Sequence, residues 1–354
     1  MSDLLLIDGS YGEGGGQILR TTIALSAVMG RPVKIINIRS KRRNPGLRNQ
    51  HITAVRAVAQ LSSASAQGLE LGSTTLIFNP GILRGGEYRF DVGTAGSITL
   101  VLQALLPLLP YLPEPTRILV SGGTDVPWSP TIDYFRNVVT HFLDRMGFKL
   151  KINLLRRGHY PRGGGVVEVI VDDPPGYLKP LNVIERGSIR FLEGISHSRR
   201  LPVHIAERQA RSAEKAIREK MPGLPVRIQV DTRDSGELGP GSGVAIWVVC
   251  EKSVLGSDSL GRRGKPAETV GREAAASLIE DLGTGMALDR HMSDMIIPLI
   301  ALSEGESMVG GSRLTSHAIT NIHVVEKLLG VKAFVEGSPE APFKLRLKGV
   351  GFRL

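Results

Sequence analysis

The chain has 354 residues, of which 42% are hydrophobic and 22% charged, as in an ordinary globular protein with more than one domain. Its formal net charge of +10 favours polyanionic partners such as RNA, DNA or nucleotides. The single cysteine, Cys250, excludes an intramolecular disulfide and gives no support to a cysteine-based zinc site, and the aromatic content of 5% argues against a broad base-stacking surface.

A pattern of strand, helix, strand, helix and two further strands is predicted twice before residue 180. The first copy has β segments at 4–8, 32–39 and 68–80 and helices at 14–30 and 44–62. The second copy has strands at 88–92, 116–123, 148–158 and 164–173 and helices at 93–109 and 130–147. Each helix has apolar residues at i, i+3, i+4 and i+7, and an internal repeat of this kind sets the architecture.

The pattern changes after residue 180. A third, less complete copy is predicted to begin at 188–196. A charged amphipathic helix at 201–223 and the strands VRIQVDT and GVAIWVVCEKS indicate a compact α+β insertion, and PGSG and GSDSLGRRGKPAE are interpreted as surface connections. Helices at 266–285, 291–305 and 316–330 then resume the repeat. The predicted division is 1–184 for repeat units, 185–275 for the inserted domain and 276–354 for the last repeat unit.

No targeting or membrane segment is predicted. The first residues lack a basic region followed by a long apolar run, and the most apolar stretch, 97–112, contains prolines and a glutamine and is interpreted as a buried helix. We therefore expect a cytoplasmic protein without a membrane partner, and the sequence leaves its oligomeric state open.

Residues 12–16 read GEGGG between the first strand and the first helix. Such a turn exposes backbone N–H groups and the positive end of the helix dipole to an anion, although neither the P-loop nor the GxGxxG spacing is present. Glu13 would repel phosphate unless a divalent cation lies between them, and the alternative is a solvated carboxylate in a turn. Gln17 and Arg20 are three positions apart, which puts them on one helical face directed toward this loop.

A basic segment at 37–51 ends one predicted strand and begins one predicted helix. Its cationic side chains, with His51 if protonated, are Arg39, Lys41, Arg42, Arg43, Arg48 and His51. This edge of an α/β sheet is where ligands usually bind, and guanidinium groups suit phosphate oxygens. The alternative is a solvated basic loop.

His317 is the histidine whose position favours chemistry. It follows GGSRLTS at a predicted junction between strand and helix, where the helix dipole disfavours the imidazolium and favours a neutral nucleophile or base. His291 and Asp294 share a helical face and either bind a metal or purine or serve only as a cap and bridge. Four other histidines are interpreted as packed, surface or partnerless residues: His141, His197, His204 and His323.

The chain resembles the RNA 3′-terminal phosphate cyclase family in blocks that run from near its start to near its end. These blocks are DGSYGEGGGQILR (8–20), IRSKRRNPGLRNQH (38–51), GGTDVPWSPTIDY (122–134), HYPRGGG (159–165), DRHMSDM (289–295) and SHAITNIHVVEKLL (316–329). The first two together are highly specific to the family. The resemblance implies a trefoil of βαβαββ units, similar to the repeats of enolpyruvyl transferases, with a small α+β domain inserted before the last unit.

The resemblance also implies an activity. With ATP as co-substrate, the family converts an RNA 3′-terminal phosphate into a 2′,3′-cyclic phosphate through a covalent histidine–AMP and then an RNA adenylate. It implies His317 as the nucleophile, with Arg20, Arg39, Arg42 and His51 as further catalytic residues. Gln17 and Gln50 would join these four residues in holding the phosphates of ATP and the RNA terminus. Glu13 would bind a divalent metal, Mg²⁺ or Mn²⁺, and the adenosine pocket would consist of Pro130, Tyr134, His291 and Asp294.

Two other functions are compatible with the same repeats. A non-catalytic cyclase-like protein would act in ribosomal RNA maturation, but such relatives lack the nucleophilic histidine that His317 supplies here. An enolpyruvyl transferase would bind phosphoenolpyruvate and form no covalent AMP, and the blocks around Glu13 and His317 argue against it.

Overall fold

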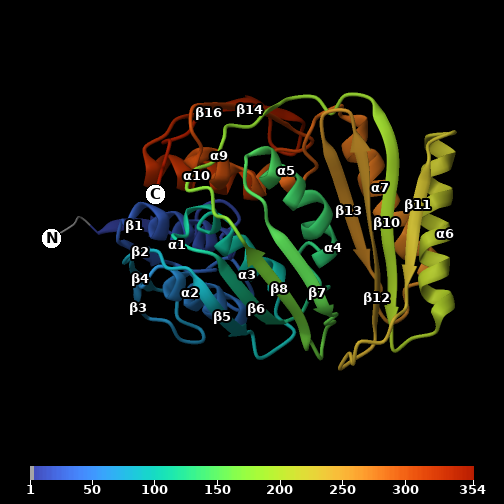
Figure 1. The fold of residues 1–354 in the computed structure, drawn as a ribbon, viewed down its shortest axis with the longest axis horizontal. Helices are drawn as coiled ribbons and strands as arrows, with labels where there is room; N and C mark the ends of the chain where they lie inside the picture. The colour runs from blue at the N-terminus through green and yellow to red at the C-terminus, as the bar shows by residue number, and fades with distance from the viewer. Residues whose placement is uncertain (1–3) are drawn as a thin grey trace.

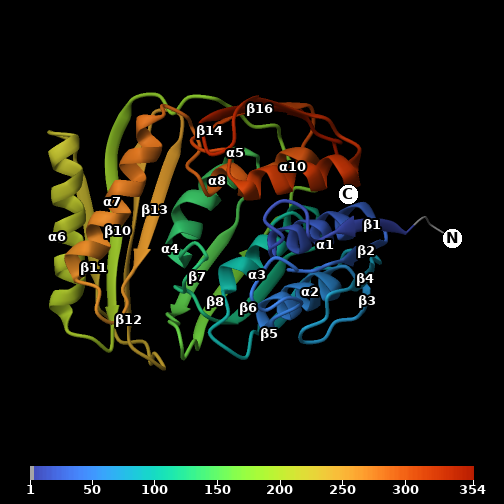
Figure 2. The ribbon, with the colours of Figure 1, turned by 180° about the vertical axis from the view of Figure 1, so that it is seen from behind.

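The computed structural model describes residues 4–354 and contains four sheets of four strands each (Figure 1). Three sheets with their helices form one body, and the fourth sheet lies at one end of the molecule with two helices of its own (Figure 2). Among the described residues, no helix is both long and apolar enough to cross a bilayer. The prediction about a signal peptide falls partly on residues 1–3, which lie outside the described residues.

The first unit has the predicted order of elements. They are β1 (Leu5–Asp8), α1 (Gln17–Met29), β2 (Val33–Ile36), α2 (Asn49–Leu61), β3 (Ser65–Gln67) and β4 (Leu76–Asn79). The strands lie side by side as β1-β2-β4-β3, with β1 parallel to β2 and β2 antiparallel to β4. Helix α1 is buried from Gln17 to Val28 and ends at Gly30, whose left-handed φ of 62° suits glycine.

The second unit repeats this arrangement as β5-β6-β8-β7. Its elements are β5 (Gly86–Asp91), α3 (Ile98–Leu105), η1 (Leu109–Tyr111), β6 (Thr116–Gly122), α4 (Ile132–Tyr134), η2 (Phe135–Val139), α5 (Thr140–Arg145), β7 (Lys151–Arg156) and β8 (Gly165–Val171). The helix predicted at 130–147 contains a π-helical turn, η2, directly after Tyr134. Such turns are frequent near functional sites.

The third unit is split by the inserted segment. Its elements are β9 (Asn182–Val183), α8 (Met292–Met295), α9 (Ile297–Leu302), β14 (Glu306–Gly311), α10 (Ser316–Leu329), β15 (Ala333–Gly337) and β16 (Phe343–Lys348). The order β9-β14-β16-β15 matches the other two sheets. The prediction that this copy begins at 188–196 is wrong, because β9 pairs with β14 while 188–196 contributes to the fourth sheet. A strand of two residues is too short to produce an alternating pattern.

The fourth sheet has the order β11-β10-β12-β13. Its elements are β10 (Ile189–Arg199), α6 (Val203–Lys220), β11 (Val226–Asp231), β12 (Gly241–Cys250), β13 (Val254–Leu260) and α7 (Ala267–Gly283). The interpretation of PGSG and GSDSLGRRGKPAE as surface connections is wrong in part: GSG of the first run lies in β12 and GSDSL of the second lies in β13, whereas the residues at 261–266 do form a connection to α7. Small polar side chains are used there because β13 packs against α7, where Ser257 donates to the carbonyl oxygen of Ala274 at 2.5 Å.

Two separate hydrophobic cores accompany this division. One joins the three repeat units, and the other lies between the fourth sheet and helices α6 and α7. The predicted boundary at 275 falls inside α7, and residues on both sides of it, Val270 and Leu278, belong to the second core. We therefore propose that the inserted domain extends to Gly283.

Helices of the three repeat units pack on one another between the sheets (Figure 1). In particular, α1 lies against α10, so the beginning of the chain contacts a helix near its end. The predicted α/β fold of three βαβαββ units is thus confirmed. This packing brings the GEGGG loop before α1 next to the first turn of α10.

Candidate active site

The glycine-rich loop at 12–16 lies in close contact with two other segments. A Cβ atom on Gly12, whose φ is +61°, would lie 2.4 Å from Oγ1 of Thr320 on α10. On the other side, Lys41 donates from Nζ to the carbonyl oxygen of Gly12 at 2.8 Å, and its stem would collide with a Cβ on Gly14. The glycines therefore let the loop fit between the basic segment and α10.

Glu13 is the acidic centre of this loop. Its Oε2 lies 2.8 Å from a guanidinium nitrogen of Arg42, and its Oε1 lies 3.4 Å from Nδ1 of His317. A Cβ on Gly15 would lie 2.0 Å from Oε1 of Glu13 and 2.7 Å from Arg42, so the carboxylate folds over the loop backbone. The structure thus brings together residues 13, 42 and 317, as the sequence predicted.

His317 occupies the first turn of α10, directly after Thr315 caps the helix by accepting from the N–H of Ala318 at 3.0 Å. Its ring is partly exposed, but Nδ1 is buried and has no hydrogen-bond partner, so the exposure belongs to the other ring atoms. Burial lowers the pKa of His317, Glu13 opposes this effect, and Arg20 and Arg42 reinforce it. The imidazole is therefore neutral near pH 7.

Arg20 and Gln17 lie together on the buried face of α1. Arg20 donates to Oε1 of Gln17 at 2.6 Å, and Gln17 donates to Oδ1 of Asn321 on α10 at 3.2 Å. Burial lowers the pKa of Arg20 to about 10, against the opposing effect of Glu13 and Asp294, so the guanidinium stays charged at neutral pH. Its Nε atom is buried without a partner. Arg20 is thus a buried cation with hydrogen-bonding capacity to spare.

His51 faces the start of α1 from the basic segment. Its Nδ1 accepts from the backbone N–H of Arg48 at 3.2 Å, which leaves the proton of the neutral ring on Nε2. Burial, followed by Arg20, Arg39 and Arg48, lowers the pKa of His51 to about 3. A Cβ on Gly16 would lie 2.5 Å from Nε2 of His51, so this N–H lies beside the open N-terminus of α1. It is a neutral hydrogen-bond donor placed where an anion would bind.

Two other residues of the basic segment are engaged elsewhere. Arg39 donates from one nitrogen to the carbonyl oxygens of Asn44 and Gly46, at 2.8 Å each, so part of its guanidinium shapes its own loop. Gln50 accepts from the backbone N–H of Ser97 at 3.1 Å and thereby connects the first unit to the second. Both residues belong to the segment that faces the GEGGG loop, but in this conformation their hydrogen bonds stabilise the fold and bind no other candidate site residue.

The four residues expected to bind adenosine differ in accessibility. Asp294 is buried, its Oδ1 has no hydrogen-bond partner, and burial raises its pKa well above the usual range. His291 is partly exposed and contacts the edge of Tyr134, at a centroid distance of 5.8 Å. Tyr134 itself is fully buried and donates to Oδ1 of Asp289 at 2.7 Å, so in this conformation it lies behind His291. Pro130 is also buried, and its carbonyl oxygen accepts from Thr99 at 2.8 Å.

Three polar residues whose hydrogen bonds connect the segments of this region were not predicted from the sequence. Asn321 binds Gln17 and also donates to the carbonyl oxygen of Asp294 at 2.7 Å. Asp289 accepts from Tyr134 and from the N–H of His291. Asp258 of β13 accepts from the N–H of Thr131 at 2.7 Å. Asn321 and Asp289 lie inside the family-like blocks, whereas the interpretation of GSDSL as a loop concealed Asp258.

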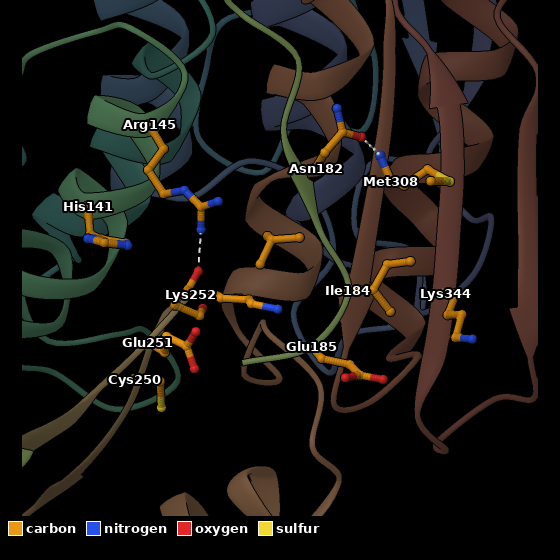
Figure 3. Close-up of a pocket in the computed structure, with 12 residues that line it drawn as sticks. His141, Arg145, Asn182, Ile184, Glu185, Cys250, Glu251, Lys252, Met308 and Lys344 are labelled. Atoms are coloured by element: carbon orange, nitrogen blue, oxygen red, sulfur yellow. Dashed lines mark hydrogen bonds between the residues drawn. The ribbon is translucent and has the colours of Figure 1, made fainter. Parts of the chain in front are cut away.

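A cavity elsewhere in the molecule is lined by none of these residues (Figure 3). It lies where α5, β9 and the turn between β12 and β13 meet, and Arg145 donates there to the carbonyl oxygen of Lys252. Its labelled side chains include His141, Glu185 and Lys344. The candidate active site is therefore the cluster around Glu13 and His317 and not this cavity.

Comparisons with known proteins point to one family. A family model described as RNA 3′-terminal phosphate cyclase matches residues 11–335. The RNA 3′-terminal phosphate cyclase of Hyperthermus butylicus is 58% identical over 99% of this chain and 99% of its own. Those of Ignicoccus hospitalis and Methanopyrus kandleri are 51% and 48% identical, each over 98% of this chain and 99% of its own.

Among solved structures, the enolpyruvyl transferase NikO from Streptomyces tendae covers 99% of this chain and 49% of its own length, with 13% sequence identity and a TM-score of 0.36. The assignment of the repeats accordingly rests on the strand orders of this chain. The family match spans nearly the whole sequence and includes the segments that carry Glu13, Arg42 and His317. The chain belongs to the RNA 3′-terminal phosphate cyclase family.

Proposed function

We propose that this protein uses ATP to convert the 3′-terminal phosphate of RNA into a 2′,3′-cyclic phosphate, and that His317 carries AMP covalently during the reaction. His317 attacks the α-phosphorus, forming an N–P bond as the bond to pyrophosphate breaks. An oxygen of the RNA 3′-phosphate then takes the AMP. Finally, the 2′-hydroxyl attacks the activated phosphorus, loses its proton and expels AMP.

The position of His317 is the observation that carries the proposal. Its Nδ1 lies 3.4 Å from a carboxylate oxygen of Glu13. Although the two atoms form no hydrogen bond in this conformation, the negative charge favours a proton on Nδ1 and leaves the lone pair on Nε2. The pKa of the ring is lowered by burial, so this lone pair is available at neutral pH. A nucleophile oriented by a neighbouring carboxylate is the usual arrangement for covalent catalysis.

Phosphate binding is assigned to Arg20, Arg42 and His51, with the N-terminus of α1. Both arginines are close enough to His317 to lower its pKa, so they flank the place where charge develops on phosphate oxygens. His51 would donate from Nε2 without adding a charge, because its pKa is far below neutrality. Gln17, Arg39 and Gln50 complete the proposed set. Gln17 accepts from Arg20, whereas Arg39 and Gln50 would have to exchange their present structural partners for phosphate oxygens.

A divalent metal, Mg²⁺ or Mn²⁺, fits beside Glu13. Mg²⁺ commonly binds through one or two carboxylates together with substrate phosphates, and Glu13 supplies one such carboxylate on a loop open to an anion. Bound there, the ion would neutralise charge on the phosphate oxygens. In its absence Arg42 neutralises the same carboxylate at 2.8 Å.

Adenosine binding is assigned to the region of Pro130, His291 and Asp294, with Tyr134 behind it. The unpartnered Oδ1 of Asp294 would bind a ribose hydroxyl or the adenine amino group. His291 presents an accessible ring whose orientation is supported by the edge of Tyr134.

Location in the cytoplasm, where ATP and RNA both occur, stays a prediction.

Incubation with ATP labelled at the α-phosphate tests the proposal. The wild-type chain should retain label after denaturation, and mass spectrometry should locate an AMP adduct on His317. His317→Ala should lose the label with an unchanged circular dichroism spectrum, whereas His323→Ala, on the same helix, should keep it. A wild-type protein that never becomes labelled would indicate a non-catalytic role in RNA maturation, and full labelling of His317→Ala would refute the nucleophile.

A further inference from the structure

Three buried side chains from distant segments converge at the contact between the second repeat unit and the fourth sheet. They are Asp125, from the loop after β6, His159, from the β7–β8 connection, and His197, from β10. One potential ligand atom from each residue lies within 4.8 Å of the other two. The two Nε2 atoms of the histidines are 3.0 Å apart.

The three side chains are almost completely removed from solvent. The exposed fraction is 2% for Asp125, 5% for His159 and 1% for His197. Oδ1 of Asp125 is buried with no hydrogen-bond partner among the described residues, and its Oδ2 is held by Arg157 at 3.1 Å and Thr124 at 2.7 Å. A buried carboxylate oxygen without a partner is costly, so this atom indicates a missing ligand.

The backbone fixes this geometry. Asp125 and His159 form a parallel β-bridge, and the N–H of Asp125 donates to the carbonyl oxygen of Gly158 at 3.2 Å. A Cβ on Gly241 would lie 2.0 Å from Cγ of His159, so β12 leaves room for the ring only because it has glycine there. The His159 imidazole is therefore preorganised beside Asp125, as metal ligands need to be.

The surroundings favour one class of ion. The linked ion pairs contain four carboxylates and four guanidiniums, from Asp125, Asp133, Asp231, Glu237, Arg136, Arg157, Arg199 and Arg233, so the network is balanced before any ion binds. An ion would therefore be held by ligand chemistry and not by excess negative charge. Two imidazoles and one carboxylate suit zinc and similar transition metals, whereas Mg²⁺ and Ca²⁺ prefer oxygen ligands.

We propose that Asp125, His159 and His197 bind one transition-metal ion of the zinc type, and that this ion ties β10 of the inserted domain to the second repeat unit. Without the ion, a single hydrogen bond joins the two Nε2 atoms and Oδ1 of Asp125 stays unpaired. The ion would coordinate all three ligand atoms at once, and Arg157 would orient the carboxylate from behind. This site is distinct from the metal site proposed at Glu13.

Metal analysis of the purified protein tests the site directly. After treatment with a chelator and dialysis, the full chain is titrated with ZnCl2 alone, and separately with CoCl2, whose visible absorption reports a low coordination number. We expect one tightly bound ion for each chain and a rise in melting temperature when zinc is restored. His197→Gln and Asp125→Asn should each weaken zinc binding by about 100-fold or more, because the first removes an imidazole ligand and the second replaces a carboxylate ligand by a neutral amide, and changes to residues that only orient ligands already cost about 10–100-fold.

Matched variants separate this site from other binding. His204→Gln changes an exposed histidine on α6 and should leave zinc binding intact, as should Glu13→Gln in the candidate active site. Because one ligand variant alone could misfold, both are checked by circular dichroism. The proposal is wrong if the wild-type chain binds no zinc, if both ligand variants bind it as the wild type does, or if Glu13→Gln abolishes it.

Discussion

Thr21 on α1 donates a hydrogen bond of 2.6 Å to Asn321 on α10, although the two residues are 300 positions apart. The same side-chain oxygen of Asn321 accepts from Gln17, and its amide nitrogen donates to the backbone of Asp294. One fully buried amide therefore fixes the distance between α1, the helix that carries His317 and the segment that carries Asp294.

Replacement of Asn321 by alanine should reduce labelling by α-labelled ATP more than it reduces folding. Loss of this side chain leaves Gln17 and Thr21 without their shared acceptor, which typically costs about 1–3 kcal/mol of stability. We expect a folded protein with at least about a tenfold lower rate of adenylation, because small displacements of reacting groups slow catalysis strongly. Asn153→Ala removes a hydrogen bond of 2.8 Å to Glu168 on β8 and serves as the control, with its adenylation rate unchanged.

The pKa of His317 should shift in opposite directions in two neighbouring variants. Arg42 lowers this pKa and Glu13 raises it, so Arg42→Met should raise it and Glu13→Gln should lower it further. In the proposed reaction the neutral ring is the nucleophile, so adenylation by the wild type should decline only as the pH falls below 6.5, the ordinary pKa of histidine. Histidine-selective NMR titration without ATP measures the pKa of His317 in the wild type and in both variants, independently of activity. Shifts of the same sign in both variants would contradict the arrangement.

Gly15→Ala should abolish labelling by α-labelled ATP while leaving the fold nearly intact. The new methyl group would lie 2.0 Å from Oε1 of Glu13 and 2.7 Å from Arg42, both at the ends of flexible side chains that move away. Stability should change by less than about 1 kcal/mol, because the added Cβ meets no rigid backbone. Gly283→Ala, whose Cβ enters open space at the end of α7, is the control and should retain full labelling.

Arg42→Ala should lower cyclisation far more than Arg262→Ala does. Arg42 lies 2.8 Å from Glu13, whereas Arg262 is exposed in the turn after β13. Loss of a preorganised charge that stabilises the transition state commonly costs about 100-fold or more in rate. Rates with an RNA bearing a 3′-phosphate give the comparison, and equal losses in the two variants would mean that the site has been located wrongly.

Arg157→Met should destabilise the whole protein. Arg157 is 2% exposed and pairs with Asp133 at 2.6 Å and Asp125 at 3.1 Å. Its removal leaves the buried Asp125 without an ion pair and leaves Asp133 with only the longer contact of 3.4 Å to Arg136. A loss of about 3–5 kcal/mol is expected in urea unfolding at neutral pH. Arg211→Ala, which loses an exposed contact of 3.9 Å to Glu207, should change stability by less than about 0.5 kcal/mol.

The repeat units could be predicted because their helices and strands are long enough to produce periodic patterns. Helix α1 and strands β6 and β8 each have a continuous or alternating apolar sequence that reflects their burial. Strand β9 has two residues and gains its identity only from its pairing with β14. Strand β13 was missed because its serines and Gly256 suit close packing against α7 and Tyr134, a tertiary contact that local composition does not report.

The proximity of three candidate site residues could also be expected, from local signals together with the family resemblance. Glu13, Arg42 and His317 stand in segments whose glycines, cations and junction between strand and helix have a chemical meaning of their own, and the structure brings them together. The buried supports Asn321 and Asp289 carry no such signal, since a buried amide or carboxylate acquires its role from partners far away in the sequence. His159 and His197 belong to the same class: each is unremarkable alone, and only the fold puts their ring nitrogens 3.0 Å apart.

The pairing of β9 with β14 has a consequence for synthesis on the ribosome. Residues 182 and 308 are partners in one ladder, and the entire fourth sheet with its two helices lies between them in the chain. The pairing of β9 with β14 therefore cannot form until the intervening segment has been synthesised. Bringing the two strands together across so long a loop is slow unless the segment has already become compact. A pulse-labelled nascent chain should accordingly acquire protease resistance over 189–283 before the strand at 182–183 becomes protected.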